Sequence, residues 1–107
     1  MAKKPKGARA ERREKERALE KLRRDKARVA AFERGGAADR PIAVTSASEV
    51  EVHARSVSCA RCDGPTELVE HAAETVNGAR LRVAHLRCRS CGAPRAVYFE
   101  LPGSTLN

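Results

Sequence analysis

Two copies of one short pattern, Cys-x-x-Cys followed within three residues by Gly and Pro, contain all four cysteines of this chain. The pairs are Cys59/Cys62 and Cys88/Cys91, with 25 residues between them. Two residues between paired thiolates let a tight turn aim both sulfurs at one point. The arrangement approximates the C-x2-C…C-x2-C pattern of zinc sites, with a somewhat longer insert. It predicts one metal site with four thiolate ligands.

The rest of the composition makes such a site necessary. The 107 residues include only one Tyr, two Phe and no Trp, so a large core is not available, and small chains of this kind usually need a metal or disulfides. The segment MAKKPKGARA lacks the apolar region of a signal peptide. We therefore expect a cytoplasmic protein, in which paired cysteines favour metal over disulfides. No apolar run approaches the roughly 18 residues of a membrane span, and no membrane partner is expected.

Four thiolates at about 2.3 Å complete a tetrahedral zinc site and leave no position for water or substrate. One structural Zn²⁺ is therefore expected, and its binding energy of roughly 10–16 kcal/mol becomes folding energy. Iron takes the same geometry, and a redox dithiol pair is a further alternative, although its usual βαβ context is missing. Cationic side chains beside the cysteines are expected to offset the negative charge of the site: Arg61, Arg87, Arg89 and Arg95.

The sequence does not indicate an enzyme. It has no open metal position, no His/Asp/Ser arrangement of recognisable spacing and no Gly-rich phosphate loop. No small-molecule substrate is expected. The three histidines, His53, His71 and His85, are interpreted as strand residues, because four cysteines already complete the site.

Between the two cysteine pairs, Asn77-Gly78 separates two strand-like segments. Asn-Gly predicts a hairpin with a type I′ turn, which needs φ > 0 at both central residues. In the second segment the apolar alternation changes phase, which predicts a bulge or twist near His85. A third strand follows the second pair, with Val97, Phe99 and Leu101 on one face. The prediction is three antiparallel strands.

CARCDGP, the Asn-Gly hairpin, CRSCGAP and the closing strand together resemble the zinc ribbon, over about residues 57–101. Zinc ribbons occur in many transcription-factor, RNA-polymerase-subunit and ribosomal-protein modules. The resemblance implies that Cys59, Cys62, Cys88 and Cys91 are zinc ligands. It does not name a partner, because ribbons bind nucleic acid and protein alike. The Ala/Arg-rich composition is typical of GC-rich bacterial genomes.

The first part of the chain has a different character. Residues 1–40 contain 15 Lys and Arg against 7 Asp and Glu, a net charge of +8, whereas residues 41–107 contain 7 of each. The fold class predicted is a small α+β, metal-stabilised domain with a long N-terminal charged helix. The expected divisions are a disordered basic tail (1–7), the helix (8–34), a linker (35–56), the zinc ribbon (57–101) and a C-terminal tail (102–107).

The helix is predicted from a run rich in Ala, Glu, Lys, Arg and Leu without Pro or Gly, which ends at a flexible stop, Gly35-Gly36. Within the linker, Ile42-Ala43-Val44 has the composition of a short strand. The residues that follow are compatible with either a helical turn or a strand. Ser46 to Glu49 matches a capping box, whereas Val50-Glu51-Val52 alternates as a strand does.

Two functions are compatible with the helix. In one, it binds a polyanion, either nucleic acid or a ribosome, through charge and with little sequence preference. The residues expected to do so are Lys3, Lys4, Lys6, Arg9, Arg12, Arg13, Lys15, Arg17, Lys21, Arg23 and Arg24. In the other, the charge only keeps the protein soluble. A thin apolar stripe, Leu19, Leu22, Val29 and Phe32, then contacts a protein partner, and we expect this stripe to pack on the ribbon or on another copy.

Overall fold

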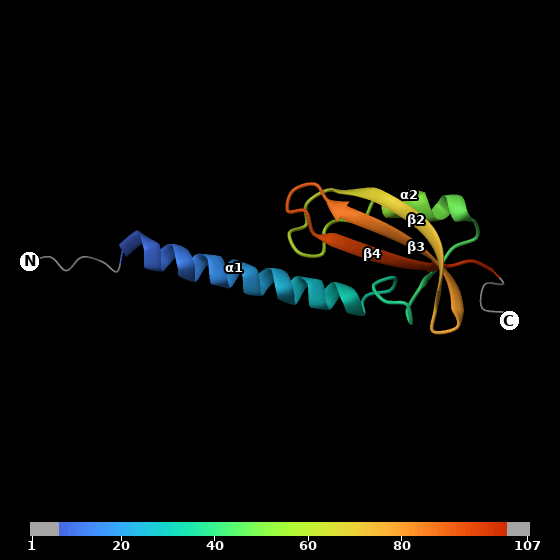
Figure 1. Cartoon of the computed structure of the whole chain (residues 1–107), viewed down its shortest axis with the longest axis horizontal. Coiled ribbons are helices and arrows are strands. Elements are labelled where there is room, and N and C mark those ends of the chain that lie inside the picture. The colour runs from blue at the N-terminus through green and yellow to red at the C-terminus, as the bar shows by residue number, and fades with distance from the viewer. Residues whose placement is uncertain (1–6, 103–107) are drawn as a thin grey trace, which may run out of the picture.

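In the computed structural model, which describes residues 7–102, a long helix extends from a small sheet whose one face is covered by a short helix (Figure 1). The long helix follows from the sequence, since its 26 residues lack Pro and contain Gly only at the first position. The elements in chain order are α1 (Gly7–Phe32), β1 (Ile42–Ala43), α2 (Ala47–Ala54), β2 (Thr66–Val76), β3 (Ala79–Cys88) and β4 (Pro94–Glu100). The chain is thus a small α+β domain.

The sheet has the strand order β1-β4-β3-β2. Strands β2, β3 and β4 are antiparallel, whereas β1 runs parallel to β4, with Ile42 opposite Phe99. The prediction of a three-stranded antiparallel sheet is therefore wrong by one strand, because the sheet is four-stranded and mixed. Two residues are too few for an alternating pattern, and the partner of β1 lies more than 50 residues away along the chain.

The hairpin between β2 and β3 is confirmed. Asn77 has φ 51° and Gly78 has φ 82°, the two left-handed conformations of a type I′ turn. Val76 pairs with Ala79 across the turn. Because this turn is specified by two adjacent residues, the sequence alone determined its place.

The irregularity expected near His85 lies in the neighbouring strand. Strand β3 pairs with β4 without interruption, while β2 shifts register between Leu68 and Glu70, opposite Leu86 and His85. The extra residue, Val69, is exposed. The change of phase in β3 has another cause: Leu81 and Val83 are buried on one face of this central strand and Ala84 and Leu86 on the other, so residues of both parities are apolar.

The core lies between α2 and one face of the sheet. Val50 and Ala54, four residues apart on α2, pack against a group of sheet side chains that includes Val97 and Phe99, and Val50 and Phe99 are each 0% exposed. The ring of His53 meets Phe99 edge to face, with centroids 5.4 Å apart. This helical spacing decides the segment that the sequence left open, and it places His53 on a helix and not on a strand.

The start of α2 uses half of the expected capping box. The N-cap residue, Ser46, makes no side-chain capping bond. The Glu49 carboxylate instead accepts bonds from the Thr45 Oγ1 hydroxyl at 2.6 Å and the Thr45 N–H at 2.7 Å. Both bonds lower the pKa of Glu49, and the bond from the Thr45 hydroxyl has the larger effect.

The junction after α1 is packed and not flexible. Gly35 is buried with φ 89°, and a Cβ there would lie 2.6 Å from the Ile42 Cδ1 atom. Its carbonyl accepts the Tyr98 N–H at 2.8 Å, which joins the end of the helix segment to β4. Arg40 adds a bond from its guanidinium to the Ala31 carbonyl at 2.7 Å, one of the last helical carbonyls.

The apolar stripe on α1 does not pack on the sheet. Leu19, Leu22, Val29 and Phe32 are 46–69% exposed, so of the two expected partners the sheet is excluded. Contact with another copy stays a prediction. Within residues 7–102, no helix combines the length and apolar character that crossing a bilayer requires.

The two phenylalanines provide a matched test of where the core lies. We expect Phe99→Ala to lower the free energy of unfolding by about 3–5 kcal/mol, since it opens a cavity in the core. Phe32→Ala, on the exposed stripe beside Arg40, should change it by less than about 1 kcal/mol. Urea unfolding at one fixed metal concentration measures both. Equal losses would place Phe32 in a core and contradict the fold.

Candidate metal centre

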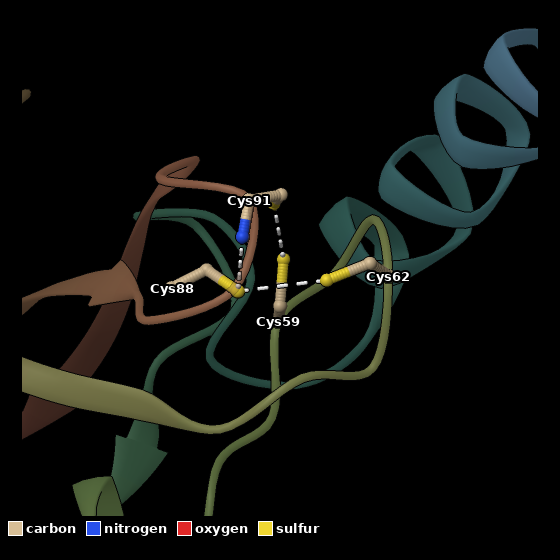
Figure 2. Close-up of side chains that lie close together, drawn as sticks. All are labelled: Cys59, Cys62, Cys88 and Cys91. Atoms are coloured by element: carbon tan, nitrogen blue, oxygen red, sulfur yellow. Dashed lines mark hydrogen bonds between the residues drawn. The ribbon is translucent and has the colours of Figure 1, made fainter.

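The four cysteines meet at one end of the sheet. The first pair lies in the loop before β2, and the second pair ends β3 and begins the next loop. Thr66 pairs with Cys88, and the Arg89 N–H bonds the Pro65 carbonyl at 2.8 Å, so the two loops are held side by side. All four sulfurs lie within 4.8 Å of one another (Figure 2).

Both loops are the same turn. In each, the N–H four residues after the first cysteine bonds that cysteine's carbonyl, from Asp63 at 3.0 Å and from Gly92 at 3.1 Å. The first cysteine's own N–H bonds the carbonyl five residues on, at 2.9 Å in both loops. The residue after the second cysteine takes a left-handed conformation, with φ 61° at Asp63 and 78° at Gly92. Repetition of one turn makes two equivalent ligand pairs. We call these loops the first and second knuckle.

Backbone N–H groups point at the sulfurs. Cys59 Sγ accepts from the Arg61 N–H, and Cys88 Sγ accepts from the N–H groups of Ser90 and Cys91, each at 3.3 Å. A Cβ at Gly64 would lie 3.2 Å from the Cys62 Sγ atom, so the backbone approaches the sulfurs closely there. These donors favour thiolates over thiols.

The distances fit a metal ion bound by four sulfurs. Two sulfur pairs, Cys59/Cys91 and Cys62/Cys88, are 3.6 and 3.5 Å apart. A tetrahedron with metal–sulfur bonds of about 2.3 Å has edges of about 3.8 Å. Both short pairs join one knuckle to the other, so an ion at the centre would connect the two loops. The four side chains can therefore hold a metal ion.

Protons and a metal compete for these sulfurs. The Cys91 N–H, followed by the Ser90 N–H, lowers the pKa of Cys88 to about 6. At Cys62 the Gly64 N–H favours the thiolate, but the hydrogen bond with Cys88, followed by burial, outweighs it and raises the pKa to about 12. A divalent cation at the centre would reverse this, because thiolates replace thiols around it. Metal binding should consequently release protons and weaken in acid.

The arginines near the site support the loops and do not contact sulfur. Arg95 donates to the Ser58 carbonyl at 2.6 Å, and the Arg89 side chain lies 4.0 Å from a Glu67 carboxylate oxygen. Arg87 is exposed. Among the described residues, hydrogen bonds to the sulfurs from outside the cysteine cluster come from the main chain. None of these guanidinium groups bonds a sulfur among the described residues, and the expected offset of the site's negative charge stays a prediction.

The histidines lie outside the sulfur cluster. His85 pairs with Glu74 at 2.7 Å across the hairpin, and His71 lies 3.3 Å from Glu51 of α2. Both are strand residues, as expected.

Two ion pairs connect the first knuckle to α1. Lys26 Nζ lies 2.6 Å from Asp63 Oδ2, and Arg61 Nη2 lies 2.6 Å from Glu20 Oε2. No local pattern indicated these contacts, since 37 and 41 residues separate the partners.

The expected polyanion-binding residues are placed as follows. Lys3, Lys4 and Lys6 lie outside the described residues. The other eight lie on α1, and all but Arg23 are exposed. They are distributed around the helix: Arg13, Arg17, Lys21 and Arg24 share one face, and the other four lie on other faces.

Comparisons with protein-family models, with curated proteins and with solved structures each found no significant match. What the structure supports is a four-cysteine knuckle site of the kind that binds zinc, in a small α+β chain.

Elemental analysis tests the site. We expect about one metal ion per chain, and Cys88→Ser should remove the bound metal and unfold residues 57–101, because the ion contributes folding energy. Ser58→Ala, a change at an exposed position beside the first knuckle, should leave metal content unchanged. A Cys88→Ser protein that keeps its hairpin signals in NMR spectra would contradict the structural role.

The two ion pairs between α1 and the first knuckle, which we call the helix anchor, can be tested in the same way. Glu20→Gln should let α1 move relative to the sheet, because it removes one of the two pairs, each worth about 0.2–1 kcal/mol. Glu16→Gln removes the same charge one turn earlier, where no ion pair forms among the described residues. Backbone ¹⁵N relaxation should show faster motion of α1 only in the first variant. Identical relaxation in both would show that the anchor does not hold the helix.

Proposed function

We propose that this chain is a non-catalytic, zinc-dependent binding module. In this proposal one structural Zn²⁺ fixes the sheet, and α1 contacts nucleic acid or a nucleic-acid-bound machine of transcription or translation. The observation that carries it is that the positive charge and the sheet belong to different parts of the chain. The excess positive charge belongs to residues 1–40, and the N-terminal part of α1 projects beyond the sheet (Figure 1).

Charge of this kind is suited to phosphates. Each Lys or Arg that neutralises a phosphate releases a counterion, which makes binding strong at low salt and independent of sequence. The helix presents ten Lys and Arg against five Asp and Glu. A helix of 26 residues spans about 39 Å, and the sheet contributes no net charge that would oppose it.

Zinc is proposed as the ion because the ligands are four thiolates in a geometry close to a tetrahedron. Such a site has no free coordination position, so the ion would stabilise the fold and would not activate a substrate. A reducing, cytoplasmic compartment of a bacterial cell would suit these thiolates and belongs to the proposal.

The exposed apolar stripe favours a second candidate, a protein-interaction or scaffold module. Four large apolar side chains, 46–69% exposed, lie on one side of α1. Such a face could meet a partner helix or another copy of this chain. In that case the charged helix would serve solubility.

Salt dependence separates the two candidates. Binding to a mixed-sequence DNA duplex should weaken by 10³-fold or more between 50 and 200 mM salt if about six phosphates are contacted, and deletion of residues 1–34 should abolish it. Fluorescence anisotropy measures the affinity. Val29→Ser with Phe32→Ser should leave duplex binding unchanged and should weaken any self-association seen in sedimentation. Undetectable binding at 50 mM salt would rule out the nucleic-acid function.

A further inference from the structure

The basic residues of α1 are interleaved with acids along the sequence, yet the helix separates them in space. At 3.6 residues per turn, positions three and four apart share a face. Five basic residues follow this spacing within an arc of about 80° and over about 22 Å of helix. We call them the basic row: Arg13, Arg17, Lys21, Arg24 and Arg28.

No acid of α1 falls within that arc. Glu16 and Glu20 border the row on one side, and Glu14 and Asp25 border it on the other. Along the chain this pattern resembles a neutralised helix, but in space it is a single line of cations between two lines of carboxylates. The row is therefore one charge wide.

The row is also exposed to solvent. All five side chains are exposed. Among residues 7–102 none of its arginines forms an ion pair. Lys21 forms one long, exposed pair with Asp25, at 3.9 Å. The contacts with the first knuckle use Glu20, which borders the row, and Lys26, on the opposite face of the helix. The anchor that holds α1 thus leaves the row facing solvent.

The chemistry of the row favours phosphates over bases. Four of its five members are arginines, whose planar guanidinium groups bind phosphate oxygens in pairs. The only other residues in the arc are Ala10 and Ala31. They offer neither an amide to read base edges nor an aromatic ring on which unpaired bases stack.

We propose that the basic row is the surface of α1 that binds nucleic acid, and that its ligand is one phosphate backbone of a duplex, bound without sequence preference. This inference rests on the proposed function and narrows it. It assigns Arg28 to the interface, a residue that the sequence did not single out. It excludes Arg12, Lys15 and Arg23 from the interface, because they lie on other faces of the helix.

A duplex fits better than a single strand because stacking is missing from the row. The flanking carboxylates repel a second line of phosphates, so the helix would lie along one strand and would not enter a groove between two. DNA and RNA duplexes share this chemistry and are separate arms of the test.

Two pairs of neighbouring residues make a matched experiment on the full, zinc-loaded chain. Arg13→Gln with Arg17→Gln removes two charges from the row, and Arg12→Gln with Lys15→Gln removes two from the opposite side of the same turns. Gln retains helix propensity, and circular dichroism checks the helix content of both variants. Anisotropy with 20-base-pair DNA and RNA duplexes gives affinity against salt concentration.

The row variant should reduce the slope of log affinity against log salt by about 1.8, because each phosphate contact contributes about 0.9. The control variant should change the slope by less than about 0.5. Binding of either duplex in this pattern supports the proposal and identifies the nucleic acid. Equal slopes in the two variants would overturn the row while leaving the proposed function in place. Tighter binding of poly-dT or polyglutamate than of either duplex would overturn the duplex assignment. Failure of the unmodified chain to bind any nucleic acid would overturn both the basic row and the proposed function.

Discussion

The convergence of four sulfurs is the constraint on which the rest of this structure depends. Apart from Phe99, the core between α2 and the sheet is made of aliphatic and alanine side chains, and a core of this size supplies little stability. The two knuckles close the same end of the sheet with identical turns. An ion bound there joins the loop before β2 to the loop after β3, and so fixes the ends of three strands at once.

The first knuckle also positions the helix. Asp63 takes the left-handed conformation that Gly92 takes in the second knuckle, although Gly would do so with less strain. A glycine could not bind Lys26, however, and the Asp63 carboxylate does. Asp63 therefore completes the turn of the first knuckle and also binds α1 through Lys26. Because the anchoring pairs are exposed, they are weak and screened by salt, so they only add to the packed junction at Gly35 in holding the helix.

The features that the sequence could predict are local ones. The two Cys-x-x-Cys turns and the Asn77-Gly78 turn are each set by residues within a few positions of one another, and the structure brings the four cysteines together and forms the hairpin turn. The features it could not predict depend on distant partners. The sequence predicts a short strand at Ile42-Ala43-Val44 but not its parallel pairing with β4, where Ile42 lies opposite Phe99, and the bulge at Val69 is visible only in its register with β3. Helix α2 was ambiguous because eight residues with two valines fit either period until a sheet face selects one.

The basic row shows why counting charge along a chain is a poor guide to a helical surface. Five carboxylates among ten cations argue against polyanion binding, but the helix moves every one of them out of the row. Within the row, Arg13, Arg17 and Lys21 are like charges one turn apart, and each such pair destabilises an isolated helix by a few tenths of a kcal/mol. A helix needed only for solubility has no reason to align them, since the same residues could alternate with acids. Phosphates bound along the row would remove the repulsion, so helix and ligand would stabilise each other.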